Sequence, residues 1–464
     1  MAMTAGRRSL SRRAGDGRPA APVRHVHIGL GSFFRAHQAW YTEHSPDRED
    51  WGIAAFTGRS SALAEALTGQ DSLYTLVTRA PSRDQFEIIS SLSAAHPASD
   101  HQGFLRYLAG AEVRVLTLTV TEAGYHRDSG GDLDAGDPAI QADLAVLRAQ
   151  VTGAVSTVPA RLTAGLAARC AASGAPITIA SCDNLPGNGP ATARVVTQFA
   201  DLLDPALARW IAGSVSFAST VVDRITPRLS ARDAAIIAAH TGREDPVPVV
   251  TEPFSEWVLS GSFPAGRPGW EHAGAALAAT ITPFEQRKLW LLNGGHSLLA
   301  YAGSLRGHDT VAAAITDQTC LAWLEQWWQE ASAQLDLPVA DTTAYRGDLL
   351  ARFANRRIRH QLAQIAADGS QKLPVRVLPV LRAERERGNL PPGAVRILAG
   401  WLCHLRGAGV PVDDPRAAEL TALASGTYHS AARRVLSALD PALGADGELV
   451  AAVCAVAREM GGPG

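Results

Sequence analysis

Apolar strand patterns alternate with helical patterns from Val23 onward, and this alternation restricts the chain to one fold class. The strand patterns are Val23–Ile28, Trp51–Phe56, Val113–Val120 and Ile177–Ser181. Helical patterns such as 139–150 and 160–172 separate them. Such alternation is typical of a parallel-rich sheet whose ligands bind at the carboxyl ends of the strands. We therefore predict a Rossmann-like α/β domain followed by a different kind of domain.

The predicted boundaries follow from changes in these patterns. The α/β domain covers 23–282, with a first half over 23–205 and a sheet-completing segment over 206–282. Beyond Pro283 strand patterns become scarce, so 283–464 is predicted to be a mostly α-helical domain, with one helix over 312–333 and a loop over 368–374. Residues 1–22 are rich in Arg, Gly, Ala and Pro. We expect them to form a disordered tail outside the fold.

A glycine turn follows the first strand. Gly29 and Gly31 lie between the strand and a predicted helix start, an arrangement that cradles a pyrophosphate. Phe34 stands where the dinucleotide fingerprint has its third glycine. The turn alone is a weak signal for dinucleotide binding.

Polar residues also end three later strand patterns. Glu122 follows the strand over 113–120, and Asp183-Asn184 follows the strand over 177–181. Asp223 ends a strand pattern that begins at Val215. In a parallel sheet these ends form the ligand-binding edge, although an acid in a turn or at a helix start is the commoner use.

The segment from Thr282 to His296 is an apolar helical pattern with polar residues on one face. At about 100° per residue, Glu285, His296 and Asn293 fall within about 140° of Lys288. Burying such groups is costly unless they pair or perform chemistry.

Lys288 stands out because lysine is so rare in this chain. Of 43 basic residues only Lys288 and Lys372 are lysines. Arginine stays protonated in proteins, whereas a buried lysine can lose its proton near neutral pH and act as a general base. The sequence therefore predicts catalysis at Lys288, with retention of both lysines by drift as the alternative.

Composition excludes several classes of protein. The formal charge of −2 gives no reason to expect a nucleic-acid or membrane partner. The five cysteines are scattered, without zinc-site or redox spacing, which favours a reducing, cytoplasmic compartment. We expect no metal, since a zinc-dependent alcohol dehydrogenase would need a Cys/His/Glu site that this spacing does not offer.

Taken together, these motifs resemble the mannitol dehydrogenase family of polyol-specific long-chain dehydrogenases, which includes fructuronate reductase. The resemblance runs from about residue 24 to beyond residue 400. Its motifs are Gly29-x-Gly31-x-Phe33-x-Arg35-Ala-His-Gln38, Thr121-Glu122-Ala-Gly-Tyr125, Asp183-Asn184, Val222-Asp223-Arg224-Ile-Thr-Pro227 and Lys288-x4-Asn293-x2-His296.

The resemblance implies a role for each matching position. Lys288 would be the general acid/base, and Asn293 with His296 would donate hydrogen bonds to the reacting oxygen. The other implied catalytic residues are Asn184 and Glu285, the latter a proton gate. The implied substrate contacts are Asp223, Lys372 and Arg352. The expected cofactor contacts are Gly29, Gly31, Phe33, Arg35, Arg59, Glu122 and Asp183.

The implied substrate is a linear hexitol or hexonate, oxidised at a secondary alcohol. Mannitol-type members carry Arg eight residues before the substrate lysine, where this chain has Gln364. This departure favours the fructuronate reductase branch, so mannonate/fructuronate and mannitol/fructose both stay open. A mannitol-1-phosphate 5-dehydrogenase-like activity and a non-catalytic nucleotide sensor are the alternatives. The protein is expected to be a monomer or a small homo-oligomer.

The cofactor expectation is NAD, with NADP as the alternative. A dinucleotide fingerprint normally ends its second strand with an acid that binds the ribose hydroxyls. Here Thr57-Gly58-Arg59-Ser60-Ser61 contains no acid, and Arg59 could hold a 2′-phosphate. The family leans toward NAD, so we expect NAD and keep NADP as the alternative.

Overall fold

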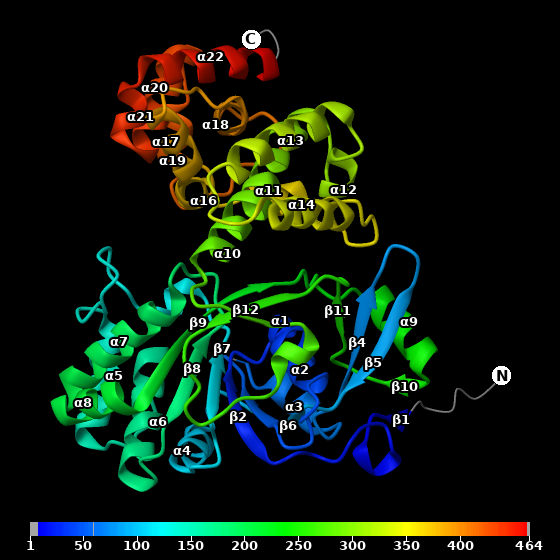
Figure 1. The fold of residues 1–464 in the computed structure, drawn as a ribbon, viewed down its shortest axis with the longest axis vertical. Helices are drawn as coiled ribbons and strands as arrows, with labels where there is room; N and C mark the ends of the chain where they lie inside the picture. Colours follow the sequence, from blue (N-terminus) through cyan, green and yellow to red (C-terminus); the bar gives the residue numbers. More distant parts are fainter. Residues whose placement is uncertain (1–7, 59, 462–464) are drawn as a thin grey trace. The chain divides into compact units, whose positions relative to one another are not determined.

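The computed structural model describes residues 8–58 and 60–461 of the chain (Figure 1). They divide into two compact units between Thr282 and Pro283. The first unit combines sheets with helices, and the second is helical.

An eight-stranded sheet forms the centre of the first unit. Its strands, in spatial order, are β13 (Ala276–Leu277), β12 (Glu256–Ser260), β9 (Val215–Asp223), β8 (Ile177–Ser181), β7 (Val115–Leu118), β2 (Val23–Ile28), β3 (Gly52–Phe56) and β6 (Leu92–His96). Only the β12–β9 pair is antiparallel. The prediction of a Rossmann-like, parallel-rich sheet is confirmed.

Successive strand residues point to opposite faces of the sheet, so the two faces pack against different cores. Phe56 and Ile28 belong to the larger core, built with α4 (His101–Ala109), α5 (Pro138–Ala149), α6 (Val158–Ala172), α7 (Asn188–Leu203) and α8 (Pro205–Ser214). Ala55 and Ile53 belong to the other, built with α1 (Ser32–Ala36), α2 (Gln38–Glu43) and α3 (Ala62–Thr68). Helix starts are set locally: Asp137 caps α5 through the Ala139 N–H, with Pro138 in the first turn.

A second sheet was not predicted from the sequence. It joins β11 (Val249–Thr251), β4 (Tyr74–Arg79) and β5 (Asp84–Ile89). The β4–β5 pair is an antiparallel hairpin, and β11 adds to β4 in parallel. Next to it, α9 (Ala231–Thr241) carries a capping box of Ser230 and Asp233.

The expectation of a disordered tail over 1–22 is wrong for residues 8–22, and residues 1–7 lie outside the described residues. Strand β1 (Arg8–Ser9) pairs with β10 (Arg243–Glu244), and η1 (Arg12–Ala14) follows it. The guanidinium of Arg12 donates to the carbonyls of Ser90 and Leu92. Arginine donors anchor this segment to backbone carbonyls, a use that an Arg-rich composition does not reveal.

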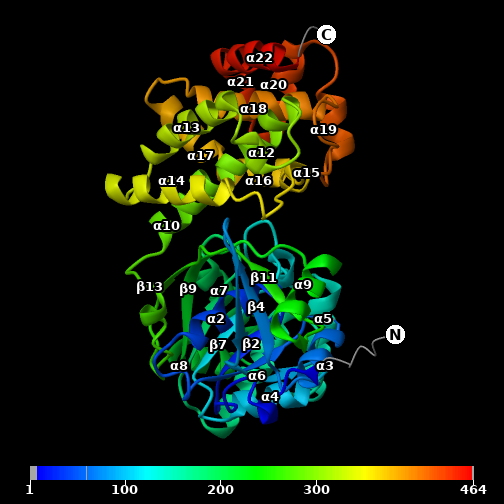
Figure 2. The same ribbon diagram turned by 90° about the vertical axis from the view of Figure 1, so that its right-hand side faces the viewer.

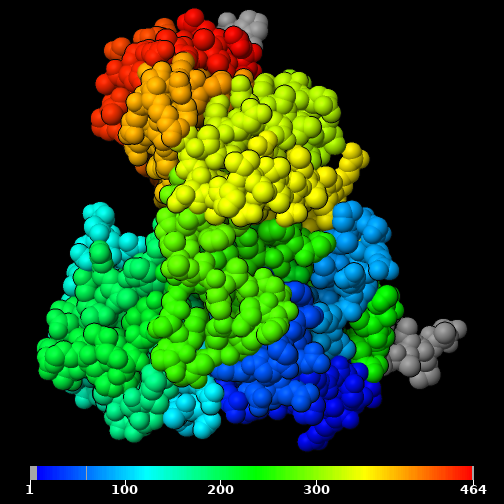
Figure 3. Space-filling view, viewed as in Figure 1, coloured from blue at the N-terminus to red at the C-terminus, as the bar shows by residue number. Residues whose placement is uncertain are grey.

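The second unit confirms the predicted helical domain. Its longer helices are α13 (Gln318–Ser332), α14 (Val339–Phe353), α17 (Leu378–Glu386), α18 (Pro392–Leu405), α20 (Tyr428–Leu439) and α22 (Gly447–Gly461), and its shorter ones are α12 (Val311–Ala314), α15 (Leu362–Ala366), α16 (Gly369–Arg376), α19 (Ala417–Leu423) and α21 (Pro441–Ala445). Helix α18 is central: it contacts α13, α17, α20 and α22 (Figure 2). In the space-filling view these helices form one packed body, coloured yellow-green to red (Figure 3).

Two helix predictions need correction. The pattern over 312–333 is interrupted between α12 and α13, where Asp317 caps the second helix. The segment from Asp368 to Pro374 was expected to be a loop but forms most of α16, which starts after Asp368 in a left-handed conformation (φ 57°). Among the described helices, none is both long enough and apolar enough to span a bilayer.

Candidate active site

The glycine turn after β2 is shaped for close backbone approach. Gly29 has φ +108°, and a Cβ atom there would lie 2.0 Å from the Thr119 carbonyl oxygen. Both facts require glycine at this position. Gly31 caps α1 without a side-chain acceptor, so no capping side chain occupies the first N–H groups of α1. The turn therefore fits the pyrophosphate cradle predicted from the sequence.

The next residues of this motif pack into the protein. Phe34, at the third glycine position, is fully buried and stacks on His27 with 3.7 Å between ring centroids. Arg35 is also buried; it donates to the Gly31 and Val247 carbonyls, and burial lowers its pKa. Phe33 stacks on His37. Arg35 and Phe33 thus shape the turn from behind, through packing contacts that the motif alone does not indicate.

Asp183 ties the ends of β7 and β8 together. Its carboxylate accepts from the Val120 N–H at 2.5 Å, the Tyr125 hydroxyl at 2.5 Å and the Ser181 hydroxyl at 3.1 Å. Burial raises the pKa of Asp183 to about 7, against these three donors, which favour the charged form. Glu122, in η2 (Glu122–Tyr125), follows β7 at this end of the sheet, and its side chain is exposed.

Asp223 and Asn184 occupy the predicted strand ends. Asp223 is the last residue of β9, and Asn184 follows Asp183 in the turn before α7. Arg224 anchors the end of β9, because its guanidinium donates to the carbonyls of Ala36 and Glu252. Asn188, which sequence analysis missed, binds the Thr220 backbone through both its amide nitrogen and its amide oxygen.

The expected 2′-phosphate contact, Arg59, lies outside the described residues. Beside it, the Thr57 hydroxyl accepts from the Ala98 N–H at 2.9 Å. Thr57 therefore supports the turn between β6 and α4.

The lysine motif lies on a π-helix in the second unit. Helix α10 (Thr282–Arg287) carries Glu285 and runs into the π-helix η4 (Lys288–Gly294), then α11 (Gly295–Leu298) and a second π-helix, η5 (Leu299–Gly303). A π-helix bonds residues five apart, so such pairs lie more nearly above one another than in an α-helix. Lys288 and Asn293 are such a pair. The angles expected for a regular α-helix are thereby corrected, and the lysine and the amide share a face.

His296 is buried in a cationic, aromatic surrounding. Its pKa lies well below the usual value because of burial, with His360, Arg352 and Arg376 adding repulsion. The imidazole is therefore neutral near pH 7, and one ring nitrogen carries a proton to donate. Its Nε2 is buried without a hydrogen-bond partner. A buried polar atom without a partner is costly unless a ligand supplies one.

Lys372 is held by neighbouring groups and is not a free cation. Its ammonium donates to the Ala367 carbonyl at 2.6 Å and lies 3.6 Å from the Asp368 carboxylate. Burial and then Arg376 lower its pKa. Arg376 donates to the Ser297 hydroxyl, and burial lowers its pKa to about 10. Sequence analysis did not select Arg376 or His360 as site residues. The one available signal for Arg376 was its position four residues after Lys372.

Comparison with known proteins agrees with this division into two parts. The chain matches the mannitol dehydrogenase Rossmann domain over residues 23–272 and the mannitol dehydrogenase C-terminal domain over residues 280–455. It is 37% identical to D-mannonate oxidoreductase of Escherichia coli (strain K12) over 413 residues, covering 85% of this chain and 83% of that protein.

Two solved structures are also similar. A D-sorbitol dehydrogenase in substrate-free form has a TM-score of 0.88 at 30% identity, covering 98% of this chain and 99% of the other. Mannitol 2-dehydrogenase of Pseudomonas fluorescens, in a ternary complex with NAD and D-mannitol, has a TM-score of 0.81 at 33% identity, covering 98% and 95%.

A Rossmann sheet with a glycine turn is followed by a helical unit, and these similarities identify the chain as an oxidoreductase of the polyol and sugar-acid dehydrogenase class. The chain belongs to the mannitol dehydrogenase family.

Proposed function

We propose that this protein is an NAD-dependent dehydrogenase that interconverts a secondary alcohol and a ketone on a linear hexonate or hexitol. Lys288 is the general acid/base, and Asn293 and His296 donate hydrogen bonds to the reacting oxygen. The observation that carries the proposal is the π-helical turn, which aligns Lys288 with Asn293 and leads directly to His296, whose buried Nε2 has no partner.

The roles follow from elementary chemistry. A bound NAD would supply the acceptor for the hydride that leaves the carbinol carbon, and Lys288 Nζ would accept the hydroxyl proton as the carbon–oxygen double bond forms. Negative charge develops on the oxygen during this step. Neutral donors fixed on one helix stabilise that charge without moving, which is the part we assign to Asn293 and His296.

The neighbouring polar groups receive supporting roles. Glu285, one turn before Lys288, passes the proton between the lysine and solvent. Asn184 supports the reacting groups and Asp223 binds a substrate hydroxyl. Gly31 and the first N–H groups of α1 would bind the NAD pyrophosphate, and Gly29, whose own N–H donates to the Phe56 carbonyl at 2.9 Å, would let the backbone approach it closely. The remaining expected cofactor contacts stay assigned to Phe33, Arg35, Glu122 and Asp183. Proton transfer to an amine needs no metal, so we propose metal-free catalysis.

A sugar acid is the favoured substrate. Arg352 and Arg376 both lower the pKa of His296, so two guanidiniums lie close enough to act on a group beside it. Guanidinium groups bind carboxylates with paired hydrogen bonds, which suits a hexonate better than a neutral hexitol. The similarity to D-mannonate oxidoreductase supports the same choice. Lys372 remains a proposed contact of this carboxylate.

The test is a comparison of matched substrates. D-mannonate and D-mannitol are oxidised with NAD, and D-fructuronate and D-fructose are reduced with NADH, each also with the NADP form. We expect the acid to exceed the neutral substrate in kcat/KM and NAD to exceed NADP. Full activity after dialysis against a chelator is expected, and no turnover of any of these substrates would refute the proposal.

A further inference from the structure

A cavity lies within the helical unit, lined in part by Ala302 of the second π-helix, η5. It has a volume of about 420 Å³ and is bordered by Arg306, Trp323, Arg396, Glu459 and Met460, and we call it the Trp323 pocket. That volume is in the usual range for sites that bind small molecules, about 300–1,000 Å³. We propose that the Trp323 pocket binds a small hydroxylated organic anion, a carboxylate or a phosphate ester.

Two guanidiniums share one indole in this pocket. The Cζ atoms of Arg306 and Arg396 lie 5.7 and 5.1 Å from the centroid of the Trp323 ring. Cations over an indole face are held by its negative π density, so both arginines are oriented before any ligand arrives. A pair of oriented guanidiniums is suited to a planar carboxylate or a phosphate.

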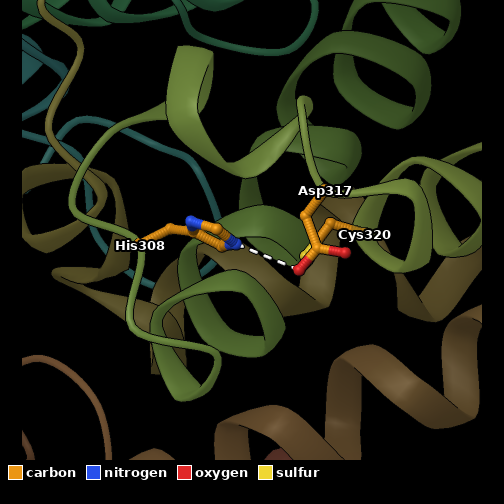
Figure 4. A group of neighbouring side chains, drawn as sticks. All are labelled: His308, Asp317 and Cys320. Carbon is orange, nitrogen blue, oxygen red and sulfur yellow. Dashed lines mark hydrogen bonds and ion pairs between the residues drawn. The ribbon is translucent and has the colours of Figure 1, made fainter.

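Arg306 is fixed from outside the pocket by Asp317. Asp317 forms a cluster with His308 and Cys320 (Figure 4). Asp317 Oδ2 accepts from Arg306 Nε at 2.5 Å and lies 3.1 Å from His308 Nε2, and its Oδ1 caps α13. Burial raises the pKa of the Cys320 thiol to about 11, which disfavours the thiolate that a metal requires. With the carboxylate already engaged by a guanidinium, the cluster serves to hold Arg306.

Arg396 has no ion pair of its own among the described residues. Its Nη1 donates to the neutral amide of Gln326 at 2.5 Å. Burial lowers its pKa, and this effect outweighs the opposite, longer-range effect of the Glu330 and Glu459 carboxylates. An anion in the pocket would restore the solvation that burial removes.

The other wall residues define the rest of the ligand. Glu459 is a carboxylate, which accepts hydrogen bonds from hydroxyl groups, and Met460 packs against carbon. A hydroxyl-bearing acid or phosphate ester satisfies both, whereas a neutral polyol gives Arg396 no ion pair. This inference does not depend on the dehydrogenase activity proposed above.

The test uses three probes with one carbon skeleton: D-glycerate, sn-glycerol 3-phosphate and glycerol. Each is titrated into the full-length protein and followed by calorimetry and by tryptophan fluorescence. We expect the anionic probes to bind with a Kd of about 1 mM or tighter. Glycerol should bind at least tenfold more weakly. Binding by glycerate alone, or by the phosphate ester alone, would identify which anion the pocket accepts.

Variants locate the site. Arg396→Gln should weaken anion binding at least tenfold, and Trp323→Phe should remove the fluorescence change. Arg382→Gln, an exposed arginine of α17 that pairs with Asp440, should bind as the parent does. If Arg396→Gln fails to fold, Arg306→Gln decides, with an expected weakening of at least threefold. Absence of binding by both anions, equal binding of glycerol, or binding unchanged in the arginine variants would overturn the inference.

Discussion

The imidazole of His296 stacks on the ring of Phe353, with 4.6 Å between ring centroids and 26° between ring planes. The stack fixes the direction in which the ring nitrogens can donate. His296→Ala should lower kcat by about 10²- to 10³-fold, the usual effect of removing an oxyanion donor. His296→Asn keeps an N–H donor and should lose less. Equal kcat in the parent and the alanine variant, by steady-state assay, would remove His296 from the reaction.

Gly29 should be irreplaceable. Gly29→Ala combines a strained left-handed φ with a Cβ clash against Thr119. We expect it to abolish NAD binding measured by calorimetry and to lower the midpoint of thermal unfolding. Gly213→Ala is the control, because nothing lies within 4 Å of its added methyl group in α8. Normal NAD affinity in Gly29→Ala would contradict the proposed pyrophosphate cradle.

Buried histidines should make the first unit sensitive to acid. Burial lowers the pKa of His25 from 6.5 to about 3. The unfolded state then binds the proton that the folded state excludes, so stability is present above about pH 6.5 and falls as pH drops below it. Between pH 7 and pH 5 this group should cost about 2 kcal/mol of unfolding free energy. Urea unfolding of His25→Gln should show a shallower decline, and an equal decline in both proteins would contradict the assignment.

A Lys372 variant tests whether this lysine binds the substrate or stabilises the structure around it. Its ammonium bonds to the Ala367 carbonyl. Lys372→Met should therefore lower the free energy of unfolding by about 1–2 kcal/mol, the usual worth of such a bond. Calorimetric melting measures this, and KM for mannonate and mannitol is compared in the same variant. A KM increase larger for mannonate than for mannitol is also expected, because Lys372 is a proposed contact of the substrate carboxylate. Unchanged stability together with equal KM changes for both substrates would contradict both roles.

Much of the fold was predictable because the periodicity and position of apolar residues in the sequence indicate where strands and helices lie. The strand runs Val23–Ile28 and Ile177–Ser181 are confirmed residue for residue. The β4–β5 hairpin was missed because Tyr74–Arg79 and Asp84–Ile89 mix polar and apolar residues, and their pairing is a tertiary contact. The tail beyond Arg8 was misjudged because its stability comes from arginine bonds to distant carbonyls such as those of Ser90 and Leu92.

The candidate site was predictable to the level of residue identity and less so in geometry. Rarity singled out Lys288, and spacing linked it with Asn293 and His296. The angles assigned to these residues assumed α-helical geometry, and no local sequence rule predicts a π-helix. Arg376 and His360 were missed because they approach His296 only through the packing of the second unit.

The central claim is that Lys288 transfers the proton. Lys288→Arg keeps the charge but stays protonated, so alcohol oxidation with NAD should lose about 10²- to 10⁴-fold in kcat. NAD affinity should change little. The parent enzyme's oxidation rate should rise with pH to a plateau, and the variant should lose that dependence. A variant with near-normal kcat and an unchanged pH profile would contradict the claim and leave His296 as the base.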